Sequence, residues 1–373
     1  MKKAKSIWVD EPQDLSFALL VCLLLVVGLI MLLSASFPSA YHETGDYAYF
    51  FKRQLVFAGI GVALMFVMSK LDYHLLRAAA LPLMALSFIL IVAVLFPSIG
   101  VVRNNARRWL YFGPVSVQPS ELAKLALIVY FSASISVKKD FMKTFRRGIF
   151  PYTVVLLIYG VLVGMEPHLS GAILVVGVGA VLMFVGGIRW RYIIVGAVFI
   201  SVFVWLMLTG KVSYGQSRIA MWHDPFIDSR GEGYQLSQSI ITIGSGGLFG
   251  VGLGCSRQKF MYLPEEHNDF IFSIVCEELG FFGAGLILLL FASIIIRGYV
   301  LALNAPDRFG RLLIIGVITL FAMQTFLNIA VVSGLVPTTG ISLPLFSYGG
   351  SALLVQLFEM GIVLSVSRQQ KTL

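Results

Sequence analysis

Charged residues are scarce in this sequence, because Asp, Glu, Lys and Arg together make up only 13% of its 373 residues. A soluble domain usually contains about 25%. Hydrophobic residues reach 58%, so an ordinary cytosolic enzyme and a disordered chain are both excluded. The three cysteines lie far apart, which excludes a disulfide framework and a cysteine-based zinc site. The five histidines form no HExxH-type pair, so no metal site is predicted.

Long apolar runs are what the sequence has in abundance. A membrane-spanning helix needs about 20 mostly apolar residues, and such runs recur along the whole chain. We predict an all-α polytopic membrane protein of about ten transmembrane helices, forming one domain over residues 1–373. The predicted helices cover residues 15–35, 50–69, 75–96, 119–137, 149–165, 168–187, 190–209, 269–296, 309–333 and 345–366.

The distribution of Lys and Arg orients these helices. Ten spans place both termini on one side, and that side carries 17 Lys and Arg residues against 5 in the short connections of the other side. The bias predicts cytoplasmic termini and one long extracytoplasmic loop, about residues 210–268, between the seventh and eighth helices. The net charge of +9 therefore reflects topology, and no nucleic-acid partner is expected.

A short outer segment breaks this charge rule. Residues 103–108 read Arg-Asn-Asn-Ala-Arg-Arg on the predicted outer face. The cations are either an accident of loop composition or an anion site at the outer membrane surface. In the second case, Arg107 and Arg108 are candidates for binding a lipid-linked diphosphate.

Two further charges lie at the start of the helix predicted over 119–137. Glu121 suits the positive end of the helix dipole, and Lys124, three residues later, can face it. The two residues either form an internal ion pair or line the outer end of a cavity, where Lys124 would bind a phosphate together with Arg107 and Arg108.

Asp269 stands where the long loop meets the next predicted helix. Partial desolvation at such a boundary raises the pKa of a carboxylate, which would suit a general base. The alternative role is a helix N-cap, which Asp favours and which stabilises a helix by about 1 kcal/mol. The two roles are compatible.

The last outer connection combines prolines, glycines and hydroxyl residues over 336–344 and 346–351. Broken backbone at membrane depth is tolerated beside a cavity or inside protein. This connection therefore either lines an outward-facing cavity or allows close helix packing through small residues.

These segments contain motifs that resemble those of the SEDS family (shape, elongation, division and sporulation; FtsW, RodA and SpoVE type). The resemblance covers about residues 15–368 and looks closest to the FtsW/SpoVE division and sporulation branch. Its motifs are Arg107-Arg108-Trp109, Gln118 to Lys124, Gly233-Tyr234-Gln235, Tyr262 to Glu265, Asp269 to Phe272, Glu277 to Gly280, Pro337 to Gly340 and Ser347 to Ser351.

The resemblance implies a peptidoglycan glycosyltransferase of the bacterial cytoplasmic membrane. Such an enzyme polymerises lipid II, an undecaprenyl-diphosphate-linked disaccharide pentapeptide, on the outer membrane face. The implied partners are a class B penicillin-binding protein and other divisome or elongasome membrane proteins, at the division septum.

The family's motifs also assign site residues. Its essential acidic residue falls on Asp269, and its basic residues fall on Arg108 and Lys124. Polar positions expected to line the cavity are Gln235, Glu277, Asn328, Thr339, Ser347, Tyr348 and Ser351.

One motif departs from the family pattern. Members often carry Gln-Pro-Asp-x-Gly, whereas this chain reads Glu-Pro-His-Leu-Ser from Glu166 to Ser170. His168 is therefore left out of the predicted catalytic residues.

No cofactor is assigned, although a divalent cation, Mg or Mn, could bridge Asp269 and the diphosphate. A lipid II flippase and a non-catalytic divisome scaffold are alternative functions. A flippase needs polar groups along the whole transport path. The outward location of Arg108, Asp269 and residues 347–351 favours the enzyme.

Overall fold

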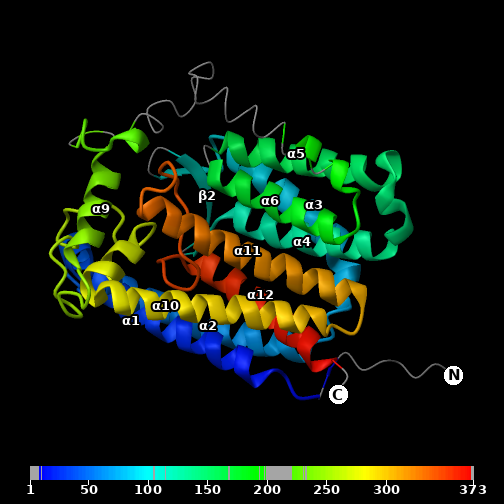
Figure 1. The fold of residues 1–373 in the computed structure, drawn as a ribbon, viewed down its shortest axis with the longest axis horizontal. Helices are drawn as coiled ribbons and strands as arrows, with labels where there is room; N and C mark the ends of the chain where they lie inside the picture. The colour runs from blue at the N-terminus through cyan, green and yellow to red at the C-terminus, as the bar shows by residue number, and fades with distance from the viewer. Residues whose placement is uncertain are drawn as a thin grey trace.

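The computed structural model describes residues 8–9, 11–103, 106–113, 115–166, 169–192, 194–196, 198, 221–229, 231 and 233–370. Long helices run side by side along one direction, with α9 and its neighbouring loops at one end of the bundle and the C-terminus at the other (Figure 1). The helices are α1 (Leu15–Thr44), α2 (Tyr49–Lys70), α3 (Leu75–Leu95), α4 (Pro119–Val137), α5 (Phe150–Met165), α6 (Leu169–Val185), α9 (Tyr234–Ser245), α10 (Ile271–Leu303), α11 (Arg308–Val332) and α12 (Gly350–Arg368).

Eight of the described helices are long and apolar enough to cross a membrane, and α6 is a shorter apolar helix. Most of the predicted span 190–209 lies outside the described residues, and each of the other predicted spans coincides with one of these helices. The outer faces of α3 and α10 expose large apolar side chains such as Leu81 and Leu286. Such faces suit contact with lipid, so the chain is a multi-pass membrane protein.

Local sequence explains where several helices begin and end. The Asp14 carboxylate accepts a hydrogen bond from the Phe17 N–H at 2.7 Å and caps α1, and Gly45 ends the helix in the left-handed region. Asp14 also binds the end of α12, because its N–H donates to Ser367 Oγ at 3.2 Å. The start of α1 and the end of α12 therefore lie at the same end of the bundle.

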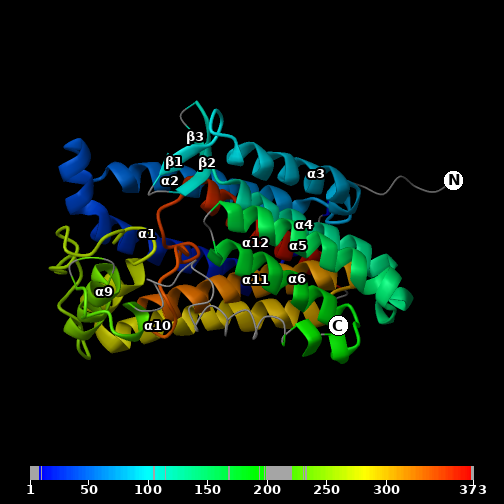
Figure 2. The same cartoon turned by 90° about the horizontal axis from the view of Figure 1, so that it is seen from above.

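A small antiparallel sheet interrupts the helices, and the sequence did not predict it. Its strands are β1 (Val101–Arg103), β2 (Ala106–Phe112) and β3 (Val115–Val117), in the order β1-β2-β3. The sheet lies at the end of α3 (Figure 2) and also contacts α4 and α12. It leads into α4 through Gln118, so it holds the arginines of β2 over the start of that helix.

The glycine-rich part of the long loop packs against a break in α10. Gly280 has φ 66° and ψ −170° inside this helix. A side chain there would meet the backbone N of Gly250 at 2.2 Å. The freed N–H of Phe281 donates instead to the Gly247 carbonyl at 2.9 Å. The glycines therefore allow two backbone segments to touch.

Candidate active site

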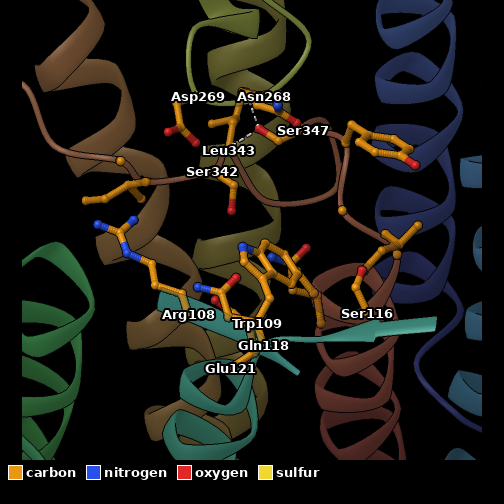
Figure 3. Close-up of a pocket in the computed structure, with 18 of the residues that line it drawn as sticks. Arg108, Trp109, Ser116, Gln118, Glu121, Asn268, Asp269, Ser342, Leu343 and Ser347 are labelled. Atoms are coloured by element: carbon orange, nitrogen blue, oxygen red, sulfur yellow. Dashed lines mark hydrogen bonds between the residues drawn. The ribbon is translucent and has the colours of Figure 1, made fainter. Parts of the chain in front are cut away.

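A polar pocket lies between the sheet, the start of α4, the start of α12 and the loops that precede α10 and α12. Its volume is about 210 Å³. Figure 3 shows Arg108, Trp109, Gln118 and Glu121 facing Asp269, Ser342 and Leu343 across it. Of the residues predicted to form the site, the pocket brings together Asp269, Arg108, Lys124, Glu121, Ser347 and Tyr348.

Arg108 and Asp269 meet at Gly340. A methyl group placed on Gly340 would lie 3.1 Å from Asp269 Oδ2 and 3.5 Å from Arg108 Nη1. The Gly340 carbonyl accepts a hydrogen bond from Ser170 Oγ at 3.1 Å, and Arg108 Nε donates to the Glu166 carbonyl at 3.2 Å. A cation and a carboxylate therefore face one small space, which the backbone around them defines.

Hydrogen bonds fix the backbone that carries Asp269. Asn328 Nδ2 donates to the carbonyls of Asp269 and Ile341, both at 2.7 Å. Ser347 Oγ donates to the Asn268 carbonyl at 2.7 Å. Two loops that are far apart in the sequence are thus tied together beside the pocket, which positions the carboxylate before a substrate arrives.

The Asp269 carboxylate does not cap α10. The N-cap residue of this helix is Phe270, and no side-chain hydrogen bond caps it. The pKa of Asp269 is raised to about 7, mainly by burial and also by the nearby Glu265 carboxylate, while Arg108 and His267 oppose the rise. A carboxylate with this pKa can accept a proton near neutral pH, as a general base must.

Glu121 and Lys124 form a buried ion pair on α4, with 2.8 Å between Lys124 Nζ and the Glu121 carboxylate. Both also line the pocket. The internal ion pair is therefore confirmed, and phosphate binding by Lys124 stays a prediction. Pairing offsets the cost of burying both charges.

Arg107 does not line the pocket. Its guanidinium donates to the Leu95 carbonyl at 3.3 Å, beside α3. Ser351 is also outside the lining; it is buried in the first turn of α12, between the lining residues Gly350 and Ala352. Neither side chain is in the lining of this pocket, and diphosphate binding by Arg107 stays a prediction.

Four other residues predicted to line the cavity do not do so. Thr339 lies beside the lining residue Gly340, and Asn328 is buried behind the loops that it joins. Gln235 lies on α9, which packs on α10 and α11. Glu277 accepts a hydrogen bond from the Arg257 N–H at 3.1 Å, in a buried cluster that fixes the long loop to α10.

That buried cluster is separate from the pocket. Lys259 Nζ pairs with Glu278 Oε1 at 2.9 Å and donates to the Gly254 carbonyl at 2.7 Å. Ser34 Oγ, on α1, donates to the Glu278 carboxylate. The polar groups partner one another, so these glutamates stabilise the fold.

Several lining residues were not predicted as site residues: Arg53, Trp109, Tyr111, Ser116, Gln118, Asn268, Gln324 and Gln356. The signal for Arg53 was present, since it is one of the few cations on the predicted outer face.

Glu166 is a further buried acid beside the site. Its carboxyl oxygens have no hydrogen-bond partner among the described residues, and burial raises its pKa to about 8, offset in part by Arg108. Residues 167 and 168, including His168, lie outside the described residues.

Among the described residues, no group of three or more His, Cys, Asp or Glu side chains is placed to hold a metal ion. The fold and the pocket together define a polytopic helical membrane protein with a polar pocket, lined by charges of both signs, toward one end of its bundle. The chain belongs to the FtsW/RodA/SpoVE family of cell cycle proteins, which it matches over residues 14–372.

Relatives and solved structures agree with this assignment. Stage V sporulation protein E of Bacillus subtilis is 44% identical over 359 residues, covering 96% of this chain and 98% of that protein. A probable peptidoglycan glycosyltransferase FtsW of Geobacter metallireducens is 40% identical over 361 residues, covering 97% and 96%. A structure of a peptidoglycan synthase complex that coordinates polymerisation and crosslinking contains a chain with a TM-score of 0.81 at 30% identity, covering 96% of this chain and 99% of that one. The rod shape determining protein RodA of Thermus thermophilus gives a TM-score of 0.71 at 29% identity, covering 96% and 98%.

Proposed function

We propose that this protein is a peptidoglycan glycosyltransferase that polymerises lipid II into β-1,4 glycan strands at the outer face of the cytoplasmic membrane. The observation that carries the proposal is the meeting of Asp269 and Arg108 at Gly340, inside a pocket that also contains Lys124. The names of the FtsW relatives support the activity.

The reaction requires a base and a cation on the two sides of one carbon atom. The donor is the growing glycan on its undecaprenyl diphosphate, and the acceptor is lipid II. The 4-hydroxyl oxygen of the acceptor GlcNAc bonds to the anomeric carbon of the donor MurNAc while the bond from that carbon to the phosphate oxygen breaks. Asp269 takes the hydroxyl proton, and undecaprenyl diphosphate leaves with the electron pair. One displacement inverts the α-linked donor into a β-linkage.

The leaving diphosphate needs electrostatic help more than protonation, because its conjugate acid is strong. Arg108 reaches the space beside Gly340, and Lys124 lines the same pocket. Preorganised cations of this kind can lower a barrier by about 3 kcal/mol. If a Mg or Mn ion takes part, Asp269 and Glu265 are the lining carboxylates that would bind it together with the substrate phosphates.

The proposal includes a partner and a place of action. The solved relative in a peptidoglycan synthase complex supports a class B penicillin-binding protein that crosslinks the new strands. The similarity to sporulation and division proteins supports a role at the septum or in a related septal process.

The test is polymerisation of purified lipid II, read as glycan polymer on a gel, by the purified protein with its transpeptidase partner. We expect Asp269→Asn to lose at least about 100-fold in rate. Asp46→Asn is the matched control, because Asp46 forms an exposed ion pair with Lys52 away from the pocket and should keep wild-type activity. Polymer made at the wild-type rate by Asp269→Asn would refute the general-base role. Lipid II translocation in liposomes without polymer would instead indicate a flippase.

A further inference from the structure

Arg53 is a third cation in the lining of the pocket, besides Arg108 and Lys124. Arg53 lies on α2, in the first turns of that helix, and its Nη1 donates to Tyr49 Oη at 3.1 Å. Tyr111 and Tyr348 line the same pocket. Of the lining residues that α2 and α12 contribute in the described part of the chain, Arg53 is the charged one.

The N-terminus of α12 opens into the same part of the pocket. Its N-cap is Gly349, and no side chain caps it. The first intrahelical bond runs from the Leu353 N–H to the Gly349 carbonyl at 2.9 Å, so the N–H groups of the preceding turn have no acceptor within the helix. Such a turn attracts an anion. Ser351 Oγ in this turn is buried and has no hydrogen-bond partner among the described residues.

Close packing holds Arg53 beside this helix end. A side chain on Gly350 would meet the ring of Phe57 at 2.4 Å, and Phe57 lies one turn after Arg53 on α2. Gln54 Oε1 accepts a hydrogen bond from the Gly349 N–H at 3.2 Å. The absence of a side chain at Gly350 thus brings the cation and the free backbone donors together.

The two cationic places belong to different parts of the pocket lining. Arg108 stands at Gly340 and Asp269, whereas Arg53 comes from α2, next to Gln54, which binds the Gly349 N–H at the start of α12.

We propose that Arg53 and the first turn of α12 form a second diphosphate site, which holds the acceptor lipid while Arg108 holds the diphosphate of the donor. This inference rests on the proposed function. In lipid II, the reacting 4-hydroxyl and the diphosphate stand at opposite ends of one disaccharide. An acceptor hydroxyl placed at Asp269 therefore puts its own diphosphate one disaccharide away, and Arg53 with the first turn of α12 supplies the cation and the backbone donors that hold it.

The first test counts bound lipids by native mass spectrometry. The purified protein is titrated with undecaprenyl diphosphate, and binding of undecaprenol is subtracted as non-specific. We expect two diphosphate lipids on the wild type and one on Arg53→Gln. Lys52→Gln is the matched control, because this neighbouring cation is exposed and pairs with Asp46 at 2.8 Å; it should still bind two.

The second test is kinetic. Loss of a charge-assisted contact to a phosphate weakens binding by about tenfold or more. Arg53→Gln should raise the lipid II concentration that gives half-maximal rate by that factor, and Arg53→Lys should restore part of it. Two lipids bound to Arg53→Gln, or one lipid bound to the wild type, would overturn the second site. The binding count needs no turnover, so a protein that binds two lipids without polymerising them would contradict the proposed function alone.

Discussion

Replacing Gly340 with alanine places a methyl group directly between the proposed base and cation. The methyl carbon would lie 3.1 Å from Asp269 Oδ2 and 3.5 Å from Arg108 Nη1. The first distance is shorter than an ordinary carbon–oxygen contact, so Asp269 must move by a few tenths of an ångström. The methyl group also occupies the space in which the attacking hydroxyl has to sit.

The expected effect is a large loss of rate in a folded protein. Gly340 has none of the left-handed backbone geometry that would forbid alanine, so the variant should fold. Misplacing reacting groups by about 1 Å costs on the order of 100-fold in rate, and a smaller shift combined with partial blocking should cost about 10- to 100-fold. The assay is the initial rate of lipid II polymerisation, with thermal unfolding followed in the same detergent.

Gly285→Ala is the matched control for this variant. Gly285 lies inside α10, and a side chain there would meet nothing within 4 Å. Alanine at this helical position should keep wild-type activity and raise stability by up to about 1 kcal/mol. Gly340→Ala with a wild-type rate would show that the space between Asp269 and Arg108 is not where the reaction occurs.

Three further predictions concern the acids around the pocket. Because the pKa of Asp269 is about 7 and a base must be ionised, the polymerisation rate should rise as the pH rises through about 7. Initial rates that stay flat from pH 5.5 to 8 would contradict the role of Asp269 as the base. Glu166, with a pKa of about 8, is mostly protonated at neutral pH, so Glu166→Gln should keep the polymerisation rate at pH 7 within about threefold. Above pH 8, ionised Glu166 would compete with the substrate for Arg108, so Glu166→Gln should remove any decline in rate there. Lys124→Met leaves Glu121 buried without its partner and should cost about 3–5 kcal/mol of stability. Adding Glu121→Gln should restore the thermal unfolding temperature but not the activity, and a double variant with wild-type rate would exclude Lys124 from the reaction.

Apolar runs were sufficient to predict the long helices of the described chain, since burial in lipid needs length and hydrophobicity alone. They did not predict α9, which lies within the expected long loop. The helix predicted from residue 345 instead begins at Gly350. Leu345 has φ 63°, and local breaks of this kind have no signal in hydropathy. The three-stranded sheet was missed because its strands are short and lie within a polar connection.

The scarcity of charge drew attention to Asp269, Arg108 and Lys124, because a charged side chain near the membrane is costly unless it has a structural or functional role. The same argument failed at Glu277, where the reason is a structural cluster with Glu278 and Lys259. Sequence spacing cannot distinguish a charge that awaits a ligand from one that already has a partner. Arg53 was counted only as part of the topology, since its neighbours in the pocket come from α12 and the sheet.

The charges that line the pocket balance one another. Among the described lining residues, Arg53, Arg108 and Lys124 carry positive charge, and Glu121, Glu265 and Asp269 carry negative charge when ionised. A lining that is close to electroneutral attracts a diphosphate through individual contacts without trapping it in a strongly positive field. Undecaprenyl diphosphate left behind after each sugar transfer is thus held by few unopposed charges, and the pocket can empty for the next round.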